Sequence, residues 1–302
     1  MKTVIVTGAN SGLGLWTTKY LLDLNYQVIM ACRDIEKAQK AINAFPEFDK
    51  SKAFIIKKLD LADFESIRNF VSDLTDFKEI YALDCNAGMS YEGPFRFSKD
   101  GIEETFATNY LGHFLLTNLL LEKYTLERIV MVSSELHNPQ NKSPFAKAEF
   151  KSVNEMAHPK VDGNSTLQKQ SQSFYATSKL CVLLFAYELD RRLRKKYSAT
   201  KTLINGMNPG LMLTTNLGRT YKPGEKFYRK FLDLIFKIIR LSDNPQNSAK
   251  TVVRLIDSVE TSGLYYDKDK VIQSSTDSYD TQKATTLWEG SEALIGTKFI
   301  IE

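Results

Sequence analysis

Short apolar runs alternate with amphipathic stretches along the first two-thirds of the chain. Six runs have the length and composition of strands, at residues 3–7, 27–31, 53–59, 80–85, 128–133 and 202–207. Between them lie five helix-like stretches, at residues 13–24, 34–44, 64–74, 102–123 and 175–197. This alternation predicts an α/β fold in which a doubly wound parallel sheet carries helices on both faces.

Two stretches interrupt the alternation. Residues 135–173 are polar and have no clean period. Residues 221–240 form a basic amphipathic insertion in which Phe231 and other apolar side chains are interleaved with lysines and arginines. Such a helix packs on the core, closes as a lid over an apolar substrate, or docks on a membrane surface, and the sequence leaves all three open. Because no linker or repeat divides the chain, we expect a single domain over residues 1–302.

Composition and charge exclude several classes of protein. Charged residues make up 25% of the chain and hydrophobic residues 43%, which excludes a disordered or low-complexity chain. A net charge of +4 is too weak to indicate nucleic-acid binding. The three cysteines and three histidines lack the spacing of a disulfide framework or a metal site. Without a signal peptide or an apolar run of about 18 residues, we expect a cytoplasmic protein with no membrane-spanning segment.

A glycine-rich turn, Thr7-Gly8-Ala9-Asn10-Ser11-Gly12-Leu13-Gly14, joins the first predicted strand to the first predicted helix. Glycines permit a tight turn and let backbone N–H groups approach a pyrophosphate at the positive end of a helix. The turn predicts cofactor contacts from Gly8, Asn10, Ser11, Gly12, Leu13 and Gly14. Glycine triplets also form plain tight turns, so this motif alone does not establish a nucleotide site.

The end of the second strand is where an adenosine ribose meets a sheet of this kind. Arg33 stands there, and neither Ala31 nor Cys32 supplies a carboxylate. A guanidinium suits a 2′-phosphate, which favours NADP(H), and the alternative is a solvated loop arginine. Asp34 is expected to cap the next helix.

Two more sequences follow predicted strands and are candidates for cofactor contact. Asp60 and Leu61 follow the third strand, where Asp60 is placed to meet the adenine, cap a helix, or do both. The fourth strand leads into Asn86-Ala87-Gly88, whose small residues let the backbone run beside a cofactor.

Tyr175 and Lys179 lie four residues apart and therefore on one face of a predicted helix. A free tyrosine has a pKa of about 10, and an ammonium group one turn away favours its phenolate. The pair suits proton exchange with an alcohol or a carbonyl during hydride transfer. It also arises by chance as a surface pair, so its meaning depends on the other motifs.

Further candidates accompany this pair. Ser134 follows the fifth strand, where its hydroxyl can hold a substrate oxygen. Asn109 lies inside a long apolar predicted helix, which indicates a bend in the helix, a bound water or simply an exposed side chain. His113, four residues later, is expected to be a histidine packed within the helix. Pro209, Gly210 and Thr214 follow the sixth strand. We expect this stretch to lie over the nicotinamide of the cofactor.

Taken in order, these motifs resemble the short-chain dehydrogenase/reductase family over about residues 1–216. The resemblance implies a Rossmann-type fold with residues 1–134 as mainly the cofactor-binding half and residues 135–302 as the catalytic and substrate-side half. It implies that Tyr175 donates or accepts the proton and that Lys179 orients the ribose and lowers the tyrosine pKa. Ser134 would polarise the substrate, and Asn109 would complete a water relay.

Within the family, the chain looks like the branch that holds retinol dehydrogenases and light-dependent protochlorophyllide reductases. This rests on Arg33, on residues 108–114, and on the gap of about 40 residues between Ser134 and Tyr175. Three segments in the last third of the chain also resemble the protochlorophyllide reductases, at residues 262–266, 274–275 and 287–292. Cys181, two residues after Lys179, fits the same group. One position departs from that group, which carries a cysteine where this chain has Leu211.

Three functions remain as hypotheses. The leading one is an NADP(H)-dependent oxidoreductase acting on a carbonyl or an alcohol of an apolar small molecule. The second is light-dependent protochlorophyllide reduction, against which Leu211 argues. The third is a cofactor-binding regulatory protein without turnover, against which the intact Ser134, Tyr175 and Lys179 argue. Neither a metal nor a nucleic-acid partner is expected, and peripheral membrane contact and the choice between monomer and homo-oligomer stay open.

Overall fold

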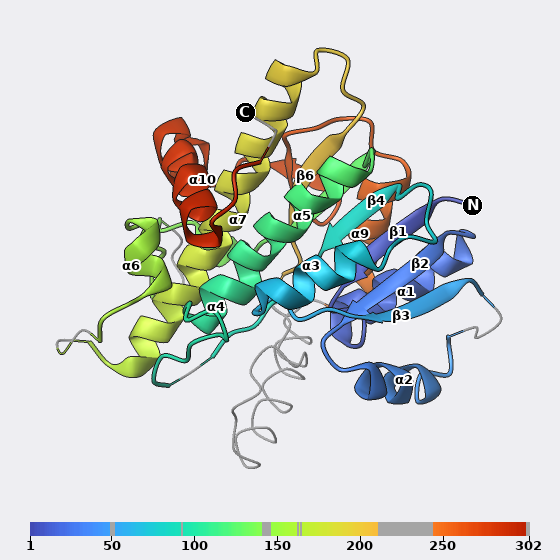
Figure 1. Ribbon diagram of the computed structural model, residues 1–302, viewed down its shortest axis with the longest axis horizontal. Coiled ribbons are helices and arrows are strands. Elements are labelled where there is room, and N and C mark those ends of the chain that lie inside the picture. Colours follow the sequence, from blue (N-terminus) through green and yellow to red (C-terminus); the bar gives the residue numbers. More distant parts are fainter. Residues whose placement is uncertain are drawn as a thin grey trace.

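One twisted sheet organises the chain (Figure 1). The computed structural model describes residues 1–48, 52–91, 93–140, 146–161, 163, 165–210 and 244–299. Its strands follow the order β3-β2-β1-β4-β5-β6-β7-β8. Their bounds are β1 Thr3–Thr7, β2 Gln27–Cys32, β3 Phe54–Lys58, β4 Ala82–Cys85, β5 Arg128–Val132, β6 Leu203–Asn208, β7 Tyr265–Asp267 and β8 Lys270–Ile272. The strand order reverses between β1 and β4, so the predicted doubly wound sheet is confirmed.

The sheet departs from the predicted all-parallel arrangement at one edge. Strands β1 to β7 pair in parallel, but β8 runs antiparallel to β7. Asp267 pairs with Lys270, so only two residues connect the strands, and such a hairpin can join only antiparallel neighbours. Lys268 in the connection has φ +56°, which suits a tight hairpin turn.

Helices cover both faces of the sheet (Figure 1). The apolar core on one face is completed by α1 Gly12–Asp23, α2 Ile35–Asn43 and α9 Pro245–Asp257. The opposite face is covered by α3 Phe64–Ser72, α5 Gly112–Lys123 and α7 Leu167–Lys196. Outside α7 lie the short α6 Val153–Ala157 and the C-terminal α10 Thr281–Ile295, whose Trp288 packs against Phe185 of α7.

Two helices differ from their predicted bounds. Helix α7 begins at Leu167, because the Thr166 side chain accepts the Lys169 N–H and starts the helix within the polar stretch that precedes Tyr175. The predicted helix over 102–123 is divided into α4 Glu104–Phe106, a π-helix over Ala107–Leu111, and α5. The polar stretch 135–173 also contains α6 and the 3₁₀-helix Glu135–His137.

The parallel arrangement brings the candidate site together. Because the carboxyl ends of parallel strands meet at one edge, the residues that follow β1, β2, β4, β5 and β6 gather there. None of the helices in the described part of the chain is long and apolar enough to cross a bilayer. The insertion at 221–240, including Phe231, lies outside the described residues.

Candidate active site

The glycine turn between β1 and α1 is tight and leaves little room for side chains. Gly8 and Gly12 have φ of +65° and +51°, in the left-handed region that favours glycine. A Cβ on Gly14 would come 2.6 Å from Asn86 Nδ2 and 2.7 Å from the Gly8 carbonyl oxygen. Within the described structure, the side chain of the N-cap Ser11 accepts no hydrogen bond from the helix. The N–H groups of the first turn of α1 are therefore free to receive a phosphate.

Thr7, the last residue of β1, ties this turn to the segment after β4. Its Oγ1 accepts the Ala87 N–H at 2.9 Å, and its carbonyl oxygen accepts Asn86 Nδ2–H at 2.7 Å. The same Oγ1 lies 3.0 Å from His113 Nε2, while His113 Nδ1 lies 3.1 Å from the Asn109 carbonyl oxygen. Burial lowers the pKa of His113 to about 4, so this residue is a neutral, packed histidine.

Arg33 stands directly after β2 with half of its side chain exposed. Its Nη1 lies 3.9 Å from Glu104 Oε1, which is a long contact for an ion pair. Asp34 accepts the Lys37 N–H at 2.9 Å and caps α2, as predicted. That hydrogen bond lowers the pKa of the Asp34 carboxyl. The carboxylate next to Arg33 is thus engaged with its own helix.

Asp60 and Leu61 form the turn after β3. Asp60 Oδ1 accepts a backbone N–H two residues further on at 3.0 Å. The cap of α3 is Asp63, whose Oδ1 accepts two N–H groups of the first turn at 3.0 and 3.2 Å, so the helix-cap alternative for Asp60 is wrong. The Leu61 carbonyl oxygen would lie 2.1 Å from a Cβ on Gly112, so α5 can approach this turn only because Gly112 has no side chain.

Ser134, Tyr175 and Lys179 meet where the end of β5 faces α7. The Lys179 ammonium donates to the Val132 carbonyl oxygen at 2.9 Å and lies 5.9 Å from the centre of the Tyr175 ring. The Ser134 hydroxyl interacts with the Tyr175 phenol and favours its ionised form. A Cβ on Gly88 would lie 3.3 Å from Lys179 Nζ, so the segment after β4 passes directly beside the lysine.

Burial sets the ionisation of the tyrosine and the lysine. It raises the pKa of Tyr175 to about 12, opposed by the Ser134 hydroxyl, and lowers the pKa of Lys179 to about 8. From the protein groups alone, the phenol is therefore protonated at pH 7. The net shift is upward because burial disfavours the phenolate, and a lowering of the tyrosine pKa by Lys179 stays a prediction.

Asn109 lies in the π-helix and is 1% exposed, so the alternative of an exposed side chain is wrong and the bend stays a prediction. Its Oδ1 accepts the Met89 N–H at 2.7 Å, and its Nδ2 donates to the Met89 carbonyl oxygen and to Ser178 Oγ, both at 2.9 Å. The side chain thereby clamps the segment after β4 against α7. The water relay through Asn109 stays a prediction.

The segment after β6 is described as far as Gly210. Its N–H donates to Asn208 Oδ1 at 3.1 Å, and the Pro209 carbonyl oxygen accepts Ser248 Oγ–H from α9 at 2.7 Å. Leu211 and Thr214 lie outside the described residues, so their expected places beside a nicotinamide and a substrate stay predictions.

Two buried polar residues near the site were not identified from the sequence. His137 is 2% exposed and hydrogen-bonds the Ser134 carbonyl oxygen. Asp84 of β4 is fully buried between Val6 and Val130, and its carboxyl oxygens have no partner among the described residues. Burial raises the pKa of Asp84 well above its usual range. The sequence could have indicated Asp84, because a carboxylate inside an apolar strand is unusual. No comparable pattern in the sequence indicates His137.

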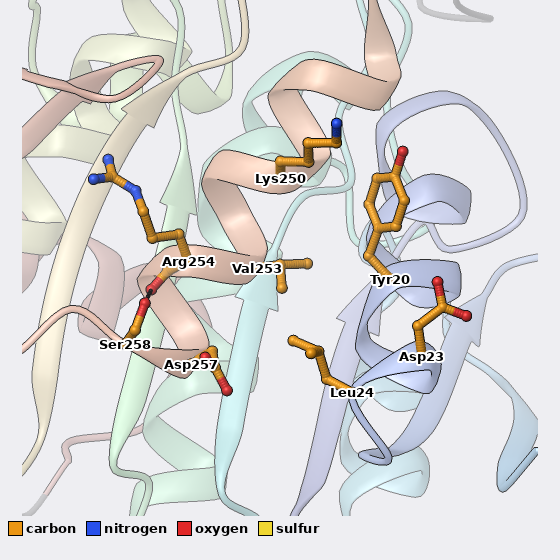
Figure 2. A pocket seen from close by; sticks show the side chains of 8 residues that line it. All are labelled: Tyr20, Asp23, Leu24, Lys250, Val253, Arg254, Asp257 and Ser258. Atoms are coloured by element: carbon orange, nitrogen blue, oxygen red, sulfur yellow. Dashed lines mark hydrogen bonds between the residues drawn. The ribbon is translucent and has the colours of Figure 1, made fainter.

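A pocket of about 340 Å³ lies away from this site, between α1 and α9 (Figure 2). Its lining residues are Tyr20, Asp23, Leu24, Lys250, Val253, Arg254, Asp257 and Ser258. These helices cover the face of the sheet opposite to α7, which carries Tyr175 and Lys179. This pocket is therefore separate from the candidate active site.

Comparison with known proteins agrees with this geometry. A family model described as short chain dehydrogenase matches residues 2–144. Human retinol dehydrogenases 14 and 13 are each 33% identical over 98% of this chain, and the alignments cover 86% and 85% of their own lengths. The chain belongs to the short-chain dehydrogenase/reductase family. A crystal structure of an uncharacterised Mycobacterium paratuberculosis protein, 26% identical, matches with a TM-score of 0.73 over 99% of this chain and 95% of its own.

As a member of the short-chain dehydrogenase/reductase family, the protein is an oxidoreductase that binds a nicotinamide cofactor. The predicted family, its branch with the retinol dehydrogenases and the predicted fold are confirmed. The alternative of protochlorophyllide reduction stays a prediction.

Proposed function

We propose that the protein transfers a hydride between NADP(H) and a carbonyl or alcohol carbon of an apolar small molecule, with Tyr175 as the proton donor or acceptor. The observation that carries this proposal is the meeting of Ser134, Tyr175 and Lys179 beside the segment that follows β4. Residues 1–134 would mainly bind the cofactor, and residues 135–302 would supply the reaction and substrate groups.

The protein groups divide the chemistry between them. The nicotinamide supplies or accepts the hydride when it is bound. In reduction, Ser134 holds the carbonyl oxygen and the protonated Tyr175 donates its phenolic proton to that oxygen. Lys179, fixed by the Val132 carbonyl oxygen, supplies positive charge beside the phenolate that remains. In oxidation the same groups act in reverse, with Tyr175 receiving the alcohol proton.

Two observations support the choice of cofactor and substrate. Arg33 presents a half-exposed guanidinium at the end of β2, and the neighbouring Asp34 is engaged in capping α2. This arrangement favours a 2′-phosphate over a free 2′-hydroxyl. The similar human proteins are named retinol dehydrogenases, which supports an apolar alcohol or aldehyde as the substrate class.

A turnover assay tests the proposal. We expect the purified protein to oxidise NADPH in the dark with retinaldehyde or a long-chain aldehyde, and to do so faster than with NADH at equal concentration. Absence of turnover with all aldehydes, ketones and retinoids tested, in both directions and with both cofactors, would contradict it. Reduction of protochlorophyllide that occurs only under illumination would favour the alternative enzyme.

A further inference from the structure

A hydrogen-bonded chain links the end of β5 to a turn far along the sequence. The first link is His137, whose Nδ1 lies 2.6 Å from the Ser134 carbonyl oxygen. The second is the Ser275 N–H, which donates to His137 Nε2 at 2.9 Å. His137 therefore connects Ser134 to a residue in the last tenth of the chain, and it does so inside the protein at 2% exposure.

These two contacts define the proton on the His137 ring. A carbonyl oxygen can only accept, so Nδ1 must carry a hydrogen, and a backbone N–H can only donate, so Nε2 must be bare. Both bonds exist together only in the neutral Nδ1–H form. Burial lowers the pKa of His137, which keeps the ring in that form.

The Ser274–Tyr279 turn is itself fixed to α7. The Tyr187 hydroxyl lies 2.8 Å from Ser274 Oγ, and the Tyr187 ring stacks on Tyr279 at 4.9 Å. Ser278 Oγ lies 2.7 Å from Ser274 Oγ and donates to the Ser275 carbonyl oxygen at 2.6 Å. Because Tyr175 and Tyr187 belong to the same helix, the turn is held in place relative to the proposed proton donor.

The His137 ring is held from one side by Tyr265 of β7. The two rings meet edge to face, 5.1 Å apart at 73°. Tyr265 fits there because Gly206 of β6 has no side chain, since a Cβ on Gly206 would lie 3.2 Å from the Tyr265 ring and 2.6 Å from Leu183. The packing therefore favours one orientation of the imidazole.

We propose that His137 is a positioning residue that transmits the placement of the Ser274–Tyr279 turn to Ser134, and so keeps the Ser134 hydroxyl against Tyr175. This inference rests on the proposed function of Ser134 and Tyr175. The Ser134 side chain accepts the Leu136 N–H at 3.3 Å, a long bond that restrains it weakly. The Ser134 carbonyl oxygen accepts the His137 backbone N–H at 3.1 Å, and the His137 ring adds a second, shorter bond to the same oxygen at 2.6 Å.

The sharpest test breaks the contact between Ser275 and His137. Ser275 has φ −62°, which proline adopts, and Ser275→Pro replaces the N–H donor by a ring carbon that points at His137 Nε2, so the contact is lost through both the missing donor and steric overlap. Ser275→Ala is the matched control, because it keeps the N–H and removes only the side chain. Loss of one neutral hydrogen bond predicts a fall in kcat of roughly 2- to 12-fold, and the overlap of the proline ring with His137 makes this a lower bound for Ser275→Pro. Ser275→Ala should change kcat much less, and neither variant should alter the Kd of NADPH.

Removal of the His137 ring tests the same link between Ser275 and Ser134. His137→Ala should lower kcat by at least as much as Ser275→Pro, and the double variant should be no slower than His137→Ala alone, because the bond is lost only once. If Ser275→Pro fails to fold, His137→Ala against the more conservative His137→Gln replaces the comparison. Additive effects, equal kcat for all variants, or a loss confined to the KM for NADPH would overturn the proposal.

An NMR measurement separates this inference from the proposed function. The chain has three histidines, so the His137 ring nitrogens can be assigned by comparison with His137→Gln. We expect a neutral Nδ1–H ring in the wild type and a raised pKa of His137 in Ser275→Pro but not in Ser275→Ala. If the ring responds in this way but no substrate is turned over, the proposed function fails and the link stands. An unchanged ring in Ser275→Pro overturns the link, whatever the wild-type activity.

Discussion

The choice of NADPH over NADH is predicted to depend on Arg33. Its side chain is 50% exposed, and its contact with Glu104 is long at 3.9 Å, so the guanidinium is available to a 2′-phosphate. A hydrogen bond to a charged group contributes about 1.5–3 kcal/mol. Because solvent screens a half-exposed group, we take the lower end, which is about a 10-fold loss of affinity. Arg33→Ala should therefore raise the Kd of NADPH about 10-fold and leave the Kd of NADH nearly unchanged.

Titration of cofactor fluorescence measures both constants directly. Lys37→Ala is the matched control, since it removes the same charge nearby from a side chain that is 75% exposed and paired with Asp34. It should weaken NADPH much less than Arg33→Ala does. Higher salt should also weaken NADPH binding more in the wild type than in Arg33→Ala. Equal losses of NADPH and NADH affinity in Arg33→Ala would refute the assignment of this arginine.

Two further predictions concern the glycine turn and the core. Gly14→Ala places a Cβ 2.6 Å from Asn86 Nδ2 and 2.7 Å from the Gly8 carbonyl oxygen. Calorimetry should therefore show weaker binding of both NADPH and NADH, and unchanged binding would contradict a role of the glycine turn in holding the cofactor. Asp84→Val should raise the free energy of unfolding at pH 7 by about 1–3 kcal/mol, because a buried polar group without a partner among the described residues is removed. The folded-state pKa of Asp84 is raised, so the wild type regains stability as the pH falls from that raised pKa toward the ordinary carboxyl value, and the gain from Asp84→Val should shrink over the same range. Urea titrations that show an equal gain at pH 4 and pH 7 would contradict the assigned cause.

The features that sequence reasoning identified share one physical basis. A parallel sheet places the ends of its strands at one edge, so residues such as Gly8, Arg33 and Ser134 could be assigned to one site without coordinates. The polar Asn109 inside an apolar helix lies in the π-helix Ala107–Leu111, and the bend predicted there stays a prediction.

The features that were missed depend on contacts between distant segments. Nothing local to His137 indicates that Ser275 will donate to it, because 138 residues separate them. Strands β7 and β8 have three residues each, too few to show a period of two. Helical spacing placed Lys179 near Tyr175, but it carried no information on the burial that raises the pKa of the phenol.

The central claim is that Tyr175 exchanges the proton that accompanies hydride transfer. Tyr175→Phe keeps the ring and removes only the hydroxyl, so the single-turnover rate of NADPH oxidation with a saturating aldehyde tests it most directly. We predict a rate about 10²–10⁴-fold below that of the wild type, with the Kd of NADPH unchanged. A rate within a few-fold of the wild type would contradict the account, because the proton would then come from another group.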